Sequence, residues 1–148
     1  MSFIKSAIYG ALVGIFFSLF SFINLIPFIG PLIGMFMGAC ACFVYPMIMI
    51  IFGYLLCVIT KVKKADYGAA GINLLIYTIT STVIFALINF LTQMLGIGFG
   101  VVTGADLLAL VVSAGAGIIG LMIAIGFQFL LLLVFGLIGA VVYLVLKK

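Results

Sequence analysis

The stretch Pro27–Thr60, PFIGPLIGMFMGACACFVYPMIMIIFGYLLCVIT, decides the fold of this chain. It contains no charged residue, and small residues recur in it at every fourth position: Gly30, Gly34, Gly38 and Cys42. On a helix this spacing places the four residues on one face, as a narrow strip that lets another helix backbone approach closely. Helices associate in this way in lipid, where the hydrophobic effect does not drive them together. The stretch therefore predicts a membrane helix built for close packing.

The composition of the whole chain also points to a membrane. The 148 residues are 69% hydrophobic and 5% charged, and their mean hydropathy is +1.68, whereas soluble domains are about half apolar and a quarter charged. No charge lies between Lys5 and Lys61, and one span needs only about 20 apolar residues. We therefore expect a single transmembrane domain over residues 1–148, with the lipid bilayer as its immediate partner.

The positive charges indicate the orientation of the chain. All of them are lysines next to apolar segments: Lys5, Lys61, Lys63, Lys64, Lys147 and Lys148. Lysines beside membrane spans mark cytoplasmic ends, so we expect the N-terminus and the Lys61–Lys64 loop to be cytoplasmic. They form no basic face with interleaved aromatic residues, and we expect no nucleic acid partner.

The first two helices are predicted to form a hairpin. Phe3–Asn24 carries a second strip of small residues at the same spacing: Ser6, Gly10, Gly14 and Ser18. Two strips of this kind can pack on each other, so we expect them to hold an antiparallel hairpin together. The second helix, Pro31–Thr60, is longer than a bilayer requires, and Pro46 is the place where we expect a kink. A fixed packing bend and a transport hinge both fit a kink there.

The third apolar segment, Tyr67–Leu95, is the most polar span. Asp66 precedes it directly, where its carboxylate can cap unpaired N–H groups at the positive end of the helix dipole. Within the span, side-chain amides are found at Asn73, Asn89 and Gln93. Amides at membrane depth generally face the bundle interior and bond to neighbouring helices. A substrate path lined by these three residues is the alternative.

The number of spans depends on the last segment. The glycine-rich stretch Gly96–Asp106 predicts an external loop, with Asp106 capping the helix that follows. Leu107–Leu146 would be about 60 Å long as one helix, twice what a bilayer needs. We therefore expect a turn near Gly126–Gln128 and an all-α polytopic bundle of five spans. The alternative is four spans, with Leu107–Ala116 as a re-entrant or interfacial helix, which places every lysine inside.

The last segment carries a further set of small residues: Ser113, Gly117, Gly120 and Ala124. Because the first two strips can pack on each other, the surface around Gly117 and Gly120 is the better candidate for contact with another subunit. Either a second copy of the chain or another membrane protein fits such a surface.

The sequence offers little chemistry for an enzyme. There is no histidine, and the only carboxylates, Asp66 and Asp106, precede proposed helices on opposite sides of the membrane. Cys40 and Cys42 project about 200° apart on a helix and cannot jointly hold a metal ion. We expect no catalytic residues, no metal site and no cofactor.

Three sequence elements resemble the Ypt-interacting-protein (YIP) family of five-span membrane proteins. They are IPFIGPLIG within an apolar hairpin, the short loop KVKKADYG, and Tyr77 in the third span, and together they lie within Ala11–Asn89. The resemblance implies a membrane scaffold or trafficking-type protein, with no catalytic residues to carry over.

The function that follows is that of a non-catalytic integral membrane protein. It would act by helix packing, as a homo-oligomer or as an accessory subunit of a larger membrane complex. The alternative is a small channel or transporter for an ion or a neutral solute, with the three amides lining its path and Pro46 as its gate.

Overall fold

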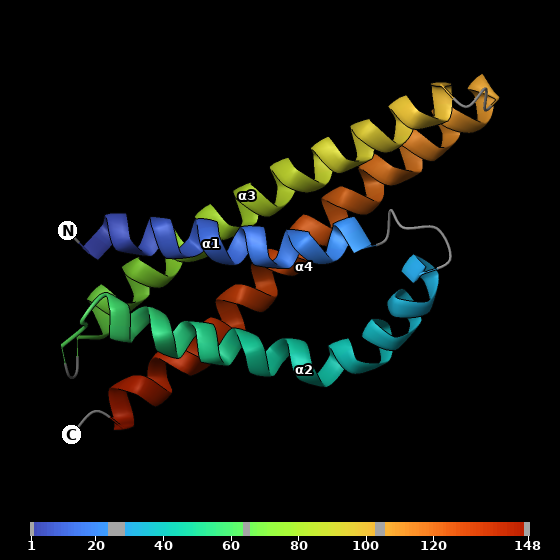
Figure 1. Ribbon diagram of the computed structural model, residues 1–148. Coiled ribbons are helices and arrows are strands. Elements are labelled where there is room, and N and C mark those ends of the chain that lie inside the picture. The colour runs from blue at the N-terminus through green and yellow to red at the C-terminus, as the bar shows by residue number, and fades with distance from the viewer. Residues whose placement is uncertain (1, 24–28, 64–65, 103–105, 147–148) are drawn as a thin grey trace.

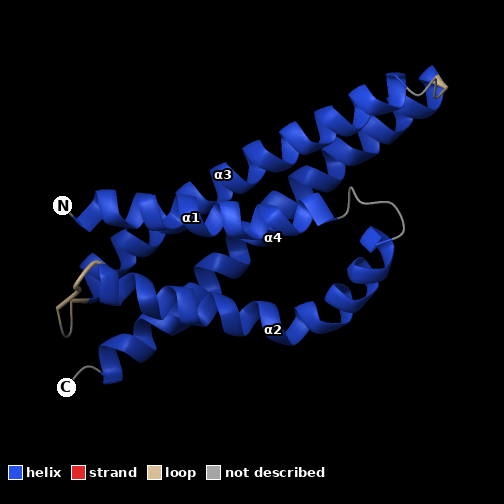
Figure 2. Cartoon of the chain, viewed as in Figure 1, coloured by secondary structure: helices blue, strands red, loops and turns tan. Residues whose placement is uncertain are grey.

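All of the described secondary structure is helical. The computed structural model describes residues 2–23, 29–63, 66–102 and 106–146, with side chains for 3–19, 44–63, 66–97, 106, 112 and 115–146. These residues form no strand (Figure 2). The helices are α1 (Ser2–Ile23), α2 (Ile29–Ile59), α3 (Tyr67–Val102) and α4 (Leu107–Leu146). The predicted all-α class is confirmed.

The prediction of five spans is wrong, because the last apolar segment is one helix. α4 runs for 40 residues and continues through Gly126–Gln128, where we expected a turn. Leu107–Ala116 is the first part of this helix and forms no separate re-entrant or interfacial element. A turn in an apolar surrounding would leave backbone groups unpaired, whereas a glycine inside a helix costs only about 1 kcal/mol.

The expectation of an external loop over Gly96–Asp106 is wrong for residues 96–102, for the same reason. α3 continues to Val102, so that its backbone passes through Gly96, Gly98 and Gly100 in helical form. Glycine is common in membrane helices, where internal hydrogen bonding of the backbone outweighs its low helix propensity. Gly96, Gly98 and Gly100 therefore belong to the helix, whereas Gly104 is outside the described residues.

The four helices form two layers (Figure 1). α1 and α2 make one layer, and α3 and α4 make the other and run obliquely to the first. The main packing contacts are between α1 and α3, between α2 and α4, and between α3 and α4, while α1 and α2 contact each other much less. α1 and α3 run in the same direction, since Ser6 meets Asn73 67 positions further on and Gly10 and Gly14 meet Tyr77 and Ser81 at the same offset.

The strip of small residues in α1 packs on α3. The sequence predicted the second helix as its partner. A Cβ added to Gly10 would lie 2.5 Å from the carbonyl oxygen of Tyr77, and one added to Gly14 would lie 2.6 Å from that of Ser81. The supposed partner strip, Gly30, Gly34, Gly38 and Cys42, is in α2, but its packing surroundings are outside the described residues. Lipid favours any close backbone contact, and the sequence spacing did not specify which helix supplies it.

A second close crossing joins α2 to α4. A Cβ added to Gly53 would overlap the carbonyl oxygen of Gly136, and one added to Gly139 would overlap that of Ile50. Tyr54 and Tyr143 pack edge to face beside this crossing, with their ring centroids 5.5 Å apart. The bundle is therefore held at two points where helix backbones nearly touch.

The lengths of the helices fit a membrane. Tyr67–Ile97 and Gly115–Leu146 are long and apolar enough to cross one. α1 has 22 residues, or about 33 Å, close to the roughly 30 Å of a hydrocarbon core. α3 and α4 are longer, and their oblique course in Figure 1 shortens their extent along the direction of α1.

One end of the bundle gathers the N-terminus, the connection between α2 and α3, and the C-terminus (Figure 1). α2 ends there in a Schellman motif, in which the Val62 N–H donates to Cys57 O and the Lys61 N–H to Val58 O, both at 3.2 Å. Lys61 has a φ of 53°, a conformation that costs an L residue about 1–2 kcal/mol. The Tyr143 hydroxyl donates to Val62 O at 3.3 Å and ties α4 to the same turn.

The α2–α4 crossing gives the first prediction. Gly139→Ala should lower the free energy of unfolding by about 1–3 kcal/mol, because the added methyl group forces the two backbones apart. The matched control is Gly71→Ala, since a Cβ added there meets nothing within 4 Å. The measurement is unfolding of the purified protein in mixed micelles of increasing SDS content. Equal effects of the two substitutions would contradict the crossing.

Candidate functional site

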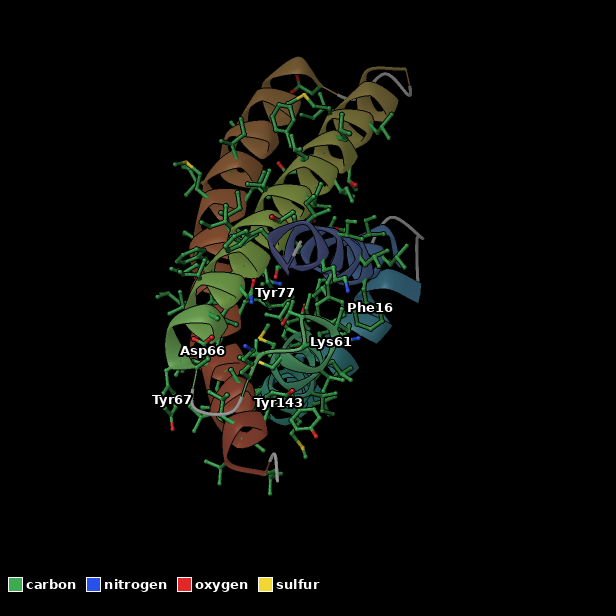
Figure 3. All side chains as sticks on the ribbon, turned by 90° about the vertical axis from the view of Figure 1, so that its left-hand side faces the viewer. Phe16, Lys61, Asp66, Tyr67, Tyr77 and Tyr143 are labelled. Carbon is green, nitrogen blue, oxygen red and sulfur yellow. The ribbon has the colours of Figure 1, made fainter. Side chains whose placement is uncertain are left out.

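The interior of the bundle contains a cluster of aromatic rings where α1, α2 and α3 meet. Tyr9 of α1 stacks on Tyr77 of α3 with 5.6 Å between ring centroids, and Phe52 of α2 meets Tyr9 edge to face at 6.1 Å. Phe17 and Tyr45 pack 4.8 Å apart further along. Figure 3 shows Tyr77 between α3 and α1. α1 lies close to α3 and farther from α2. Large aromatic side chains therefore make the contacts between α1 and α2.

Each of the three amides predicted to line a path has a hydrogen-bond partner. Asn73 is buried, and its Oδ1 accepts a bond of 3.0 Å from the Ser6 hydroxyl of α1. Asn89 Nδ2 donates to Phe85 O at 2.8 Å, within the same helix. Gln93 Nε2 donates to Gly117 O of α4 at 3.1 Å. Asn73 and Gln93 are about 30 Å apart along α3, so the structure does not bring all three amides together.

Most of the unpaired polar groups in the described interior are hydroxyls instead. Among the described side chains, five buried hydroxyl groups have no hydrogen-bond partner: those of Tyr9, Tyr77, Thr78, Ser81 and Thr82. Thr80 and Thr92, by contrast, each donate to the carbonyl one turn earlier at 2.8 Å. A buried group without a partner costs about 1–3 kcal/mol, and four of the five follow one another within two turns of α3. The polar centre of this bundle is therefore at residues 77–82.

The sequence contains a signal for this cluster of hydroxyls. The run Thr78–Thr82, TITST, places four hydroxyl residues inside an apolar helix. Hydroxyl side chains in helices usually bond to their own backbone, so a run of them is weaker evidence for an interior polar site than an amide. Their burial depends on α1 and α4 lying on the two sides of α3, and that arrangement is not encoded in the run itself.

A cavity of about 520 Å³ lies beside Pro46. Its walls are formed chiefly by the aromatic rings of Tyr45, Phe85, Phe127 and Phe135, together with Pro46 and Gln128. Pro46 is inside α2, which Figure 1 shows to be bent. Proline removes a backbone N–H and clashes with the preceding turn, which is the physical reason for a bend at such a residue.

Gln128 supplies a side-chain amide to this cavity. Its side chain is 5% exposed, and its Nε2 has no hydrogen-bond partner. It comes from the middle of α4, from the stretch where we expected a turn, and it follows Ala124 by one helical turn. The sequence predicted a connection between two spans at this glutamine, whereas the residue is an interior side chain of α4.

Asp66 and Asp106 lie at helix starts. The Ala69 N–H donates to Asp66 Oδ1 at 3.0 Å, which is the geometry of an N-cap. Asp66 lies near Tyr67 in Figure 3, at the end of the bundle nearest the viewer. Asp106 precedes Leu107, the first residue of α4. Both carboxylates are thus outside the interior cluster and the cavity.

The small residues of α4 have different surroundings. A Cβ added to Gly117 would lie 3.1 Å from Gln93 Oε1, whereas one added to Gly120 would meet nothing within 4 Å. Ala124 is exposed and borders the cavity. The surroundings of the Ser113 side chain are outside the described residues. Gly117 therefore serves the contact with α3, and Gly120 is open to the surroundings.

The fold and the interior define a class of protein: a helical bundle with two helices long and apolar enough to cross a membrane. Within the described ranges, no three His, Cys, Asp or Glu side chains are grouped so that they could hold a metal ion. Comparison with protein-family models, with curated proteins and with solved structures found no match to this chain. The resemblance to the YIP family stays a prediction.

The hydroxyl cluster leads to the second prediction. Thr78→Val and Thr82→Val keep the shape of each side chain and remove an unpaired hydroxyl, so each should raise the free energy of unfolding by about 1 kcal/mol. Thr80→Val, which removes a hydroxyl with a partner, is the control and should not stabilise the protein. The same SDS titration measures all three. A loss of stability in Thr78→Val would mean that this hydroxyl has a partner in the native membrane protein.

Proposed function

We propose that this protein is a non-catalytic integral membrane protein that acts by packing against other membrane helices. It does so as a homo-oligomer or as an accessory subunit of a larger complex. The observation that carries the proposal is the arm formed by residues 91–97 of α3 and 115–123 of α4. This arm extends beyond α1 and α2 in Figure 1.

The arm has an uncovered surface suited to another helix. Met122 and Ile123 are 70% and 68% exposed, and Ile119 is exposed as well. A Cβ added to Gly115 or Gly120 would meet nothing within 4 Å, so a second backbone can come close there. Close approach at small residues is the main source of affinity between helices in lipid. A membrane helix from a second subunit would complete the arm as α1 and α2 complete the rest of the bundle.

The same proposal includes four transmembrane helices, with the end of the bundle that carries the lysines on the cytoplasmic side. An even number of spans places both termini on one side, together with the connection between α2 and α3. Lys5, Lys61 and Lys63 belong to that end, and the sequence adds lysines at 64, 147 and 148. Positive charge of this kind favours the cytoplasmic side. A scaffold or trafficking-type role is the narrower proposal, and it rests on the YIP resemblance alone.

The third prediction tests the arm. Gly120→Leu should reduce the mass of the complex measured by light scattering in mild detergent, because the larger side chain holds the partner helix away. Gly71→Leu is the control: Gly71 is also open, but it lies at the lysine end of α3, and the mass should not change. The accessory-subunit form predicts instead a second membrane protein that co-purifies with the wild type and is lost from the Gly120→Leu variant. A wild-type monomer without a co-purifying protein would overturn the proposal.

A channel or transporter is the second candidate, favoured by the five unpaired hydroxyls around residues 77–82. Such groups can exchange hydrogen bonds with water or with a small neutral solute as it passes. They replace the three amides as the proposed lining, because those amides already have partners.

The fourth prediction separates this candidate from the first. Purified protein in liposomes should release a trapped small polar solute such as glycerol, and Thr78→Val combined with Ser81→Ala should reduce that flux at least tenfold. Asn89→Leu is the control and should leave the flux unchanged, since its amide bonds to its own helix. If liposomes with the wild-type protein release no more solute than protein-free liposomes, transport is contradicted and the packing proposal is unaffected.

A further inference from the structure

We propose that the cavity beside Pro46 binds an uncharged, lipid-soluble ring compound that carries a carbonyl oxygen, and that Gln128 holds this oxygen. The observation is an apolar cavity of about 520 Å³ with one buried, unpaired amide donor in its wall. Neither the helix packing nor the hydroxyl cluster uses this site.

The size and the walls of the cavity determine the body of the ligand. Small-molecule sites typically measure about 300–1,000 Å³ and are lined mostly by apolar and aromatic groups with a few placed polar atoms. Here the rings of Tyr45, Phe85, Phe127 and Phe135 line the space. Aromatic side chains pack well in offset-stacked and edge-to-face arrangements on another ring. A flat ring system therefore fits these walls better than a branched aliphatic body.

The polar part of the ligand follows from Gln128. Its Nε2 is a donor without a partner, in a part of the bundle where the hydrocarbon core offers no bulk water. A buried donor of this kind needs an acceptor, and a carbonyl oxygen is the acceptor that an otherwise apolar ring compound carries. No charged side chain is among the described residues that line the cavity, so an ionic ligand would have no counter-charge.

The depth of the site argues against a phospholipid. Pro46 lies thirteen positions before Ile59, the last residue of α2, or about 20 Å inside the lysine end of the bundle. In a hydrocarbon core of roughly 30 Å this is about 10 Å from the opposite interface. The ester carbonyls of a phospholipid remain at the interfaces, so its chains would present only methylene groups to Gln128. A molecule dissolved in the core can bring an oxygen to this depth.

The ligand can enter from the lipid. Ala124 and Phe127 border the cavity and are exposed on the surface of α4, Phe127 to 63%. The entrance therefore faces the bilayer interior, where a lipid-soluble ring compound is concentrated. Access from water is not required.

The experiment compares two probes that share a ring body. Menadione has a methylated naphthalene skeleton with two carbonyl groups, and 2-methylnaphthalene has the same skeleton without them. Binding to the protein in deuterated detergent micelles is measured by saturation-transfer NMR, with empty micelles as the baseline. The wild type should bind menadione about tenfold more tightly than 2-methylnaphthalene, as expected for one hydrogen bond in an apolar site.

Three variants identify the site. Gln128→Met keeps the length of the side chain without a donor, and it should weaken menadione binding about tenfold while leaving 2-methylnaphthalene binding unchanged. Gln93→Leu removes an amide outside the cavity and should change neither affinity. Ala124→Phe fills the entrance, so binding of both probes should be lost. This variant tests the site if circular dichroism shows that Gln128→Met does not fold.

Four results would overturn the proposal. These are equal affinity of the wild type for both probes, unchanged menadione binding in a folded Gln128→Met variant, retention of both probes by a folded Ala124→Phe variant, and full displacement of menadione by added phospholipid. The last result would assign the cavity to a lipid chain.

Discussion

The close approach of helix backbones at glycine is the interaction on which this structure depends. In lipid, apolar side chains gain little by leaving the solvent, so helices must find their affinity in tight contact. α1 reaches α3 at Gly10 and Gly14, and α2 reaches α4 at Gly53, Gly136 and Gly139. Each contact joins a helix of one layer to a helix of the other. The two layers are thus fixed at two crossings, and the remaining interior space is shaped by what lies between them.

That interior space accounts for the hydroxyl cluster at residues 77–82 and for the cavity beside Pro46. Between the crossings α1 and α2 are held apart, and Tyr9, Phe17, Phe52 and Tyr77 bridge the distance with their rings. Rings fill volume efficiently but offer few hydrogen-bond acceptors, and hydroxyls of α3 in the same interior are unpaired. Further along, α2 is bent and lies away from α4, and an open volume remains beside Pro46. The hydroxyl cluster and the cavity are both consequences of how the layers are joined.

The sequence predicted the nature of the elements better than their arrangement. Lack of charge and high hydropathy predicted an all-helical chain, and the starts of α3 and α4 at Tyr67 and Leu107 agree with the expectation. The glycines at 96–100 and the Gly126–Gln128 stretch were misjudged, because turn propensities measured in water do not apply where an unpaired backbone group is so costly. The partner of the strip at Gly10 and Gly14 could not be predicted, since a four-residue spacing defines a face but not what covers it.

The candidate site was the hardest part to foresee, and two glutamines show why. Gln93 and Gln128 are the same residue type, each inside a long apolar helix, and the sequence alone favoured Gln93 as the functional one. In the structure Gln93 is opposite Gly117, whose lack of a side chain leaves its carbonyl within reach, and the amide is satisfied. Gln128 borders the cavity beside Pro46 of α2, where the neighbouring side chains are mostly aromatic rings, and its Nε2 donor has no partner. The difference arises from the residue across the interface, so polarity alone cannot tell a structural amide from one available to a ligand.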